Sequence, residues 1–289
     1  MTAAPALLQL TPEQVVCDVR RLPSLPMVVL ELLKSIDLDA SSMKFLADKI
    51  SHDQALAATA LRLANSSFYG MPSRVGNMQQ AISLLGLSTM RSLLVAATIT
   101  TSFGPETQAS LDLATFWRES IGTAVCARHL ALRGPAVPGT AFIAGLLHDI
   151  GRLVIATCYG PAQSAVVAWQ AAHGGAISDA ERAIIGTDHA AIGAMLATHW
   201  HFPQEIVDAV ADHHHAQSDF SRVIWLADLL SHALALEEAG PSPPEHALAP
   251  GCEPDLMLRE QFGLDDRDMA RLVEQVVAEH AGICQVLVQ

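Results

Sequence analysis

Apolar residues recur at helical spacing along almost the whole chain, and no stretch alternates apolar and polar positions as a half-buried strand does. The pattern starts at Thr11-Pro12-Glu13, where a threonine cap and a proline suit a first helical turn. Later apolar stripes predict helices at about residues 26–36, 42–50, 54–64, 77–85, 88–102, 110–132, 141–159, 161–173, 178–185, 188–200, 203–213, 219–238 and 255–280. We therefore predict an all-α fold.

Two breaks in this pattern divide the chain. The first is Gly104-Pro105, and the second is the proline-rich stretch from Gly240 to Pro254. They predict an N-terminal helical lobe over residues 1–105 and a second helical lobe, packed against it, over 106–238. Residues 239–289 are then a proline-rich loop followed by a C-terminal helical extension.

The predicted helix at 141–159 differs from the others because a histidine and an aspartate, His148 and Asp149, interrupt its hydrophobic sequence. Thr140 is the expected N-cap. Small residues stand on the side of the helix opposite its apolar stripe, notably Gly145 and Gly151. A glycine inside a helix costs about 1 kcal/mol relative to alanine, so two of them indicate close approach of another segment. We infer that His148 and Asp149 point into a second packed interface.

Other polar residues stand in helices where they need partners. Asp228 lies in an apolar helix, and a buried carboxylate is costly unless it is hydrogen-bonded or metal-bound. His189 lies in a first helical turn, and His213 and His214 lie at a helix end, where the helix dipole alone can favour histidine. The sequence leaves both interpretations open. Together with His148 and Asp149, these residues would make a mixed nitrogen and oxygen site that suits Fe, Mn, Zn or Co better than Ca.

The hydrophobic content is 51% and the mean hydropathy is +0.30, which indicates a large core. No run of 18 apolar residues is free of polar interruption, so we expect no membrane span and no membrane partner. The N-terminus lacks a basic segment followed by an apolar one, so we expect no signal peptide. The five scattered cysteines are expected to be reduced thiols, which favours a cytoplasmic protein.

Charge is distributed unevenly. The first 106 residues are balanced, and the remainder carries the whole net charge of −13. Such an acidic surface repels phosphate backbones, so direct binding of nucleic acid is disfavoured. The chain has no HExxH motif, CxxC pair, Walker A loop or GxSxG motif, so hydride transfer, P-loop hydrolysis and serine hydrolysis lack a signature. No organic cofactor is expected.

Several motifs together resemble a known family. The sequences LLHDIGRL, DHAAIGAMLATHW, AVADHHH and WLADLLSHA are similar to the HD superfamily of metal-dependent phosphohydrolases. Upstream, LPSLP, ISHDQALAATALRLANSSFYG and AISLLGLSTMRSLL resemble the HDOD family, the HD-related output domain of bacterial signalling proteins. The resemblance covers about residues 12–236. It implies a smaller N-terminal helical lobe packed on an HD-domain-like lobe, and a regulatory role.

The resemblance assigns candidate metal ligands. His148 and Asp149 match the HD pair, Asp228 matches the last aspartate of the superfamily, and His189 with His213 or His214 match the extra histidines of two-metal relatives.

Two further positions depart from the family pattern. Glu119, within FWRESIG, stands where the first histidine of the superfamily falls, and a glutamate can also bind a metal. By periodicity Glu119 lies off the apolar stripe of its helix, so we expect its side chain to be exposed. Arg152 stands where cyclic-di-GMP-hydrolysing HD-GYP relatives carry a lysine, and it is a candidate phosphate contact. The GYP loop of those relatives is not found, which argues against cyclic-di-GMP hydrolysis.

Two functions therefore compete. In the first, the chain is a regulatory HDOD protein without catalysis, which binds other signalling proteins such as cyclic-di-GMP enzymes or a sensor kinase. In the second, it is a metal-dependent phosphohydrolase that acts on a phosphate ester or nucleotide, with Arg152 orienting the phosphate. A divalent metal (Fe, Mn or Zn) is a possible cofactor in both, as a structural ion or a catalytic one. Catalytic residues stay unassigned, and a homo-oligomer is open.

Overall fold

The computed structural model describes residues 10–22, 24–25, 29, 31, 50–51, 53–66, 75–103, 111–234, 236 and 254–288, and within these ranges it is helical with no strand. The all-α prediction is confirmed. The N-terminal helices are α1 (Pro12–Val19), α4 (Gln54–Ala64), α5 (Met78–Leu85) and α6 (Leu87–Ser102). They are followed by α7 (Leu113–Ala131), α8 (Pro138–Leu147), α9 (Ile150–Cys158), α10 (Gly160–His173), α11 (Ile177–Ile185), α12 (His189–His199), α13 (Gln204–Asp212), α14 (Asp219–Ala233), α15 (Pro254–Phe262) and α16 (Asp266–Leu287).

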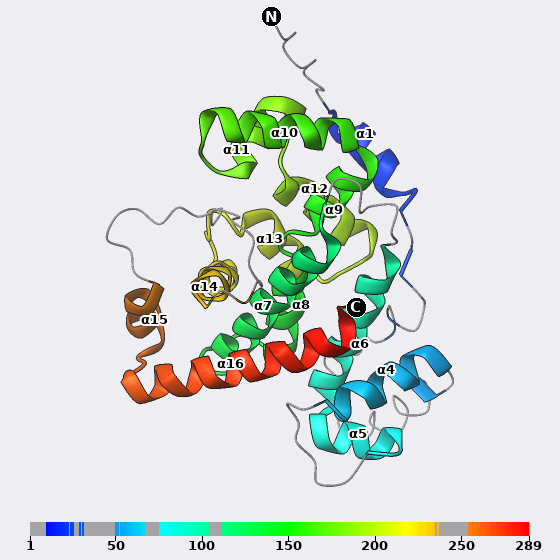
Figure 1. Cartoon of the computed structure of the whole chain (residues 1–289), viewed down its shortest axis with the longest axis vertical. Coiled ribbons are helices and arrows are strands. Elements are labelled where there is room, and N and C mark those ends of the chain that lie inside the picture. Colours follow the sequence, from blue (N-terminus) through cyan, green and yellow to red (C-terminus); the bar gives the residue numbers. More distant parts are fainter. Residues whose placement is uncertain are drawn as a thin grey trace, which may run out of the picture.

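Some predicted features fall on residues that are not described. These are most of the predicted helices at 26–36 and 42–50, and both predicted lobe boundaries, near residues 105 and 238. The division into lobes therefore stays a prediction. The first helix does not stay with its N-terminal neighbours: α1 packs against α12, and the amide of Leu10 donates to the carbonyl oxygen of Ile185 at 2.9 Å. Figure 1 shows α1 at the end of the molecule opposite α4 and α5.

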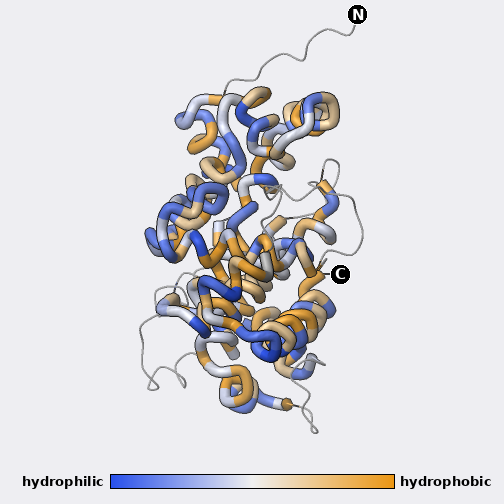
Figure 2. Tube along the Cα trace, turned by 90° about the vertical axis from the view of Figure 1, so that its left-hand side faces the viewer, coloured by the Kyte–Doolittle hydropathy of each residue, from blue (hydrophilic) through white to orange (hydrophobic). Residues whose placement is uncertain are grey.

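Helix α7 lies at the centre of the fold, where it packs against α8, α14 and α16 (Figure 1). Because neighbours cover it on several sides, all of its residues from Ser120 to Ala131 are buried. Hydrophobic and hydrophilic residues alternate along the helices, and hydrophobic segments run through the middle of the molecule (Figure 2). This core fixes the positions of the polar groups that point into it.

The stretch around His148 and Asp149 differs from the single capped helix expected there. Helix α8 ends at Leu147, both residues lie in a turn, and α9 begins at Ile150. The cap prediction is wrong: α8 begins at Pro138 after Val137, and Thr140 is buried inside its first turn. A proline at the first helical position needs no amide partner, so α8 can begin without a polar cap. The predicted C-terminal helix is likewise two helices, α15 and α16, separated at Gly263, whose φ is +63°.

The two glycines of this stretch have the close contacts that the sequence predicts. A methyl group at Gly145 would lie 2.9 Å from the carbonyl oxygen of Thr123 on α7, and one at Gly151 would overlap the backbone of His189 on α12. Only glycine lets α8 approach α7, and α9 approach α12, this closely. The turn between α8 and α9 is thereby held between α7 and α12.

Among the residues that the structure describes, Pro138–Cys158 is long and apolar enough to cross a membrane by composition alone, and α5 with α6 passes the same test only if this bent pair is taken as one span. The structure buries 83% of the most apolar window of Pro138–Cys158 inside the fold. Packing in the core therefore accounts for its hydropathy without a membrane.

Candidate metal centre

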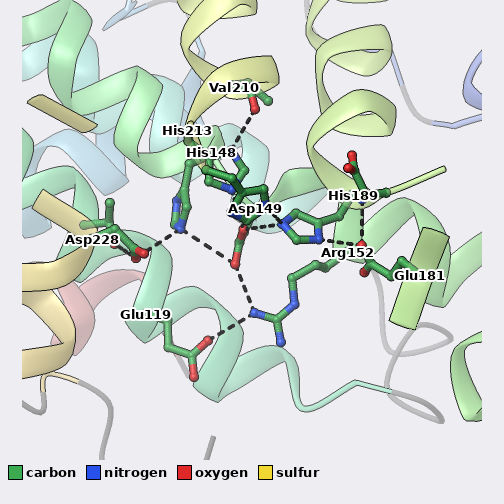
Figure 3. Close-up of polar contacts among 12 residues, drawn as sticks. Glu119, His148, Asp149, Arg152, Glu181, His189, Val210, His213 and Asp228 are labelled. Carbon is green, nitrogen blue, oxygen red and sulfur yellow. Dashed lines mark hydrogen bonds and ion pairs between the residues drawn. The ribbon is translucent and has the colours of Figure 1, made fainter. Parts of the chain in front are cut away.

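The turn between α8 and α9 directs His148 and Asp149 into the interior. His148 is 3% exposed and Asp149 is 7% exposed. Asp228, from α14, is 4% exposed, and its Oδ1 lies 3.3 Å from His148 Nε2. The prediction that this pair is held inside the protein together with Asp228 is confirmed (Figure 3).

Three histidines of this centre are oriented through their Nδ1 atoms. His148 Nδ1 lies 2.7 Å from the carbonyl oxygen of Gly145, and His213 Nδ1 lies 2.7 Å from that of Val210. His189 Nδ1 lies 2.6 Å from Glu181 Oε2. A carbonyl oxygen only accepts hydrogen bonds, so Nδ1 of His148 and of His213 carries a proton. The Nε2 atoms are then presented toward the centre, which is how a second shell orients metal-binding histidines.

These Nε2 atoms converge on Asp149. Its Oδ1 lies 3.2 Å from His189 Nε2 and 3.4 Å from His213 Nε2, and its Oδ2 lies 3.7 Å from His148 Nε2. Oδ1 of Asp149 and Nε2 of His213 are buried and have no hydrogen-bond partner. A buried polar atom without a partner is destabilising by about 1–3 kcal/mol, more for a charged group. A cation placed among these atoms would satisfy them.

His214 completes this nitrogen-rich side. Its Nε2 lies 2.9 Å from His189 Nε2, and one potential ligand atom from each of His189, His213 and His214 lies within 4.8 Å of the others. Imidazole nitrogens with a carboxylate oxygen are a donor set that suits Fe, Mn and Zn. The residues present therefore fit a divalent metal.

Burial and charge act against each other on the ionisable groups. Burial disfavours the charged form of His148, but Asp149 and Asp228 outweigh this and raise its pKa to about 9. Burial likewise opposes ionisation of Asp149, but the charges of His148 and His189 hold the pKa of Asp149 well below its usual range. Burial lowers the pKa of His213, which favours the neutral imidazole with a lone pair on Nε2.

Glu119 and Arg152 meet at the edge of the centre. Arg152 Nη1 lies 3.0 Å from Asp149 Oδ2 and 3.7 Å from Glu119 Oε2 (Figure 3). The Glu119 side chain is only 12% exposed, so the expectation of an exposed glutamate is wrong. When several neighbours cover a helix, its buried surface is wider than its apolar stripe. Helix α7 is such a helix, and at Glu119 its polar side faces α9.

The structure thus brings every predicted candidate into one cluster: Glu119, His148, Asp149, Arg152, His189, His213, His214 and Asp228. Their role as metal ligands, and that of Arg152 as a phosphate contact, stay predictions. Two partners were missed. Glu181, 1% exposed on α11, accepts from both the backbone amide and the ring of His189, and Thr123 on α7 donates to Asp228 Oδ1 at 3.1 Å. Nothing in the local sequence marks either residue, because both contacts depend on tertiary packing.

An all-helical core with a His–Asp turn facing a distant aspartate defines the class of HD-related domains. A family model of the HDOD domain matches residues 22–216. The chain belongs to the HDOD family.

Solved structures agree with this fold. An HDOD domain protein of unknown function from Geobacter sulfurreducens has a TM-score of 0.74 and 24% identity, and the match covers 96% of this chain and 100% of that one. A protein described as a candidate phosphohydrolase from Shewanella amazonensis SB2B has a TM-score of 0.72 and 26% identity, with 94% and 97% covered. A candidate signal transduction protein from Marinobacter aquaeolei VT8 has a TM-score of 0.72 and 23% identity, with 99% and 64% covered.

A curated relative from Treponema pallidum (strain Nichols), an uncharacterised protein, is 27% identical over 209 residues. The match covers 70% of this chain and 40% of the relative, so this chain spans less than half the length of that protein.

Proposed function

We propose that this chain is a regulatory HDOD protein that acts by binding other signalling proteins, and that its HD-type centre does not turn over a substrate. The observation that carries the proposal is the position of Arg152. Its guanidinium is directed at Asp149 and Glu119, so the group that would hold a substrate phosphate is engaged by carboxylates of the protein itself.

The proposed partners are cyclic-di-GMP enzymes or a sensor kinase, and a second copy of the chain is a further partner to test. The net charge of −13 favours a partner with a basic surface, because complementary charge speeds association and selects among partners. Side chains that can add apolar contact area are exposed on the described helices and loops: Leu132, Val137, Val167, Leu256 and Val277.

Within the same proposal, the centre holds a divalent Fe, Mn or Zn ion. His189, His213 and Asp149 Oδ1 would hold it, with His214 beside them. Such an ion, when bound, supplies Lewis acidity and fixes the packing of the helices that carry its ligands. In a regulatory protein the second effect is the important one, because it stabilises the surface that partners bind.

A phosphohydrolase is the second candidate. It is favoured by the geometry of His148 with Asp149 and Asp228, and by the likeness to the Shewanella amazonensis protein described as a candidate phosphohydrolase. In that function Arg152 would leave its carboxylate partners and orient a phosphate ester.

Turnover assays separate the two. Protein purified without chelator is assayed on phosphomonoesters and cyclic dinucleotides with added Mn or Fe, beside an Asp149→Asn variant. The regulatory proposal predicts no metal-dependent turnover above that of the variant. Turnover that disappears in a folded Asp149→Asn protein would instead establish the hydrolase. Binding to purified candidate partners, measured for both proteins, tests the interaction itself.

A further inference from the structure

Asp149 divides the candidate metal centre into two halves. Its Oδ1 faces His189 and His213, at 3.2 Å and 3.4 Å from their Nε2 atoms. Its Oδ2 faces Arg152 Nη1 at 3.0 Å and His148 Nε2 at 3.7 Å. A carboxylate placed in this way can bridge two cations, one on each oxygen.

The Oδ2 half already contains a cation that belongs to the chain. Arg152 Nη1 lies between Asp149 Oδ2 and Glu119 Oε2, and its side chain is 19% exposed. A guanidinium stays charged at any ordinary pH. The other donors of this half, His148 and Asp228, are paired with each other at 3.3 Å.

The Oδ1 half differs because, among the described residues, it contains no arginine or lysine and holds two buried polar atoms without a hydrogen bond. Oδ1 of Asp149 and Nε2 of His213 are buried without a hydrogen bond, although Nδ1 of His213 is held by Val210. The ring of His189 is held in the same way by Glu181, so both Nε2 atoms are oriented before any ion binds.

We propose that Arg152 is the resident cation of the Oδ2 half and limits this centre to one divalent ion, held at the Oδ1 half by His189, His213 and Asp149. This inference rests on the metal binding proposed above. Two metals in such sites lie about 3.5–4 Å apart, so a guanidinium on the bridging carboxylate repels a second ion strongly. Removing the charge of Arg152 frees Glu119, His148, Asp149 and Asp228 to hold a second ion.

The test counts metal ions per chain. Wild-type protein, Arg152→Gln and Arg152→Lys are dialysed against Mn²⁺ or Zn²⁺, and bound metal is measured by elemental analysis beside a thermal melt. We expect about one ion in the wild type and in Arg152→Lys, which keeps the charge, and about two in Arg152→Gln. In the Mn²⁺ form, electron paramagnetic resonance of Arg152→Gln should show a coupled pair of ions. The double variant Arg152→Gln with Glu119→Gln should return to about one.

A second variant in the wild-type background keeps the test independent of how Arg152→Gln folds. Glu119→Gln should retain the single ion, because Glu119 contacts Arg152 instead of the metal, whereas His213→Ala should lose it. Two ions in the wild type, or loss of the ion in Glu119→Gln, would overturn the inference. One ion in a folded Arg152→Gln protein would overturn it as well and leave the metal proposal standing. No metal in any of these proteins would overturn both.

Discussion

Two buried carboxylates, Glu279 and Asp149, differ in how their oxygens are used. Glu279, 4% exposed on α16, has both oxygens engaged: Oε1 pairs with Arg128 Nη2, and Oε2 lies 2.8 Å from His129 Nε2. Asp149 is buried to a similar degree, yet its Oδ1 has no hydrogen bond although imidazole nitrogens lie within 3.4 Å. A carboxylate that only joins two helices needs donors on both oxygens, whereas one that binds a metal keeps an oxygen for the ion.

Removing Glu279 should have the largest effect on stability. Glu279→Ala leaves the Arg128 guanidinium buried without its carboxylate, and breaking a buried ion pair from one side is destabilising by about 3–5 kcal/mol. Urea unfolding measures the change, with Glu274→Ala, on an exposed position of the same helix, as the control. A loss no larger than that of the control would show that the α7–α16 pair does not hold the C-terminal helix in place. Metal content should be unchanged.

His129, which also contacts Glu279, makes the stability of the protein depend on pH. Burial and the nearby charges of Arg128 and Arg133 lower the pKa of His129 to about 4, from 6.5. Between these values the unfolded chain binds a proton that the folded chain does not, so the free energy of unfolding falls as the pH drops from 6.5 toward 4. A pKa shift of this size corresponds to roughly 3 kcal/mol.

Urea unfolding at several pH values, for wild type and His129→Gln, isolates this contribution. The variant should be less stable near neutral pH but should lose less stability than the wild type on acidification. Equal slopes for the two proteins over this range would mean that His129 is protonated in the folded state, so that Glu279 is paired with two cations.

A smaller effect is expected on the metal side of α7. Thr123 donates to Asp228 Oδ1, and Thr123→Val keeps the shape of the side chain but removes this donor from a buried carboxylate. The expected loss of stability is about 1–2 kcal/mol. Thr198→Val is the matched control, because Thr198 is exposed and donates only to a carbonyl oxygen of its own helix. If the two variants unfold alike, Asp228 does not depend on α7 for its position.

Of the two regions compared, the sequence predicts the one around Asp149 but not the one around Glu279. Helical periodicity predicts the helical stretches on either side of His148 and Asp149. The glycines opposite the apolar stripe correctly indicate close contacts, which the structure shows between α8 and α7 and between α9 and α12. The resemblance to HD proteins supplies the candidate ligands. The pair of His129 and Glu279 has no such signal, because the two residues are 150 positions apart and no motif marks either of them.

The error at Glu119 has a physical cause. The apolar stripe predicts an exposed Glu119 because periodicity treats a helix as having one neighbour. Helix α7 packs against α8, α14 and α16, and Glu119 itself faces Arg152 on α9, so a polar residue off the stripe is still largely covered. Glu181 was missed for a related reason: it contacts His189 only because α11 and α12 fold back on each other.

Metal binding by the purified chain tests the central claim most directly, namely that Asp149, unlike Glu279, is built to hold a cation. Calorimetric titration with Mn²⁺ or Zn²⁺ compares the wild type with His213→Ala and Glu274→Ala. We predict binding in the wild type and in Glu274→Ala, and loss of binding in a folded His213→Ala protein. Wild-type protein that binds neither ion, or a His213→Ala variant that binds as tightly as the wild type, would contradict the claim.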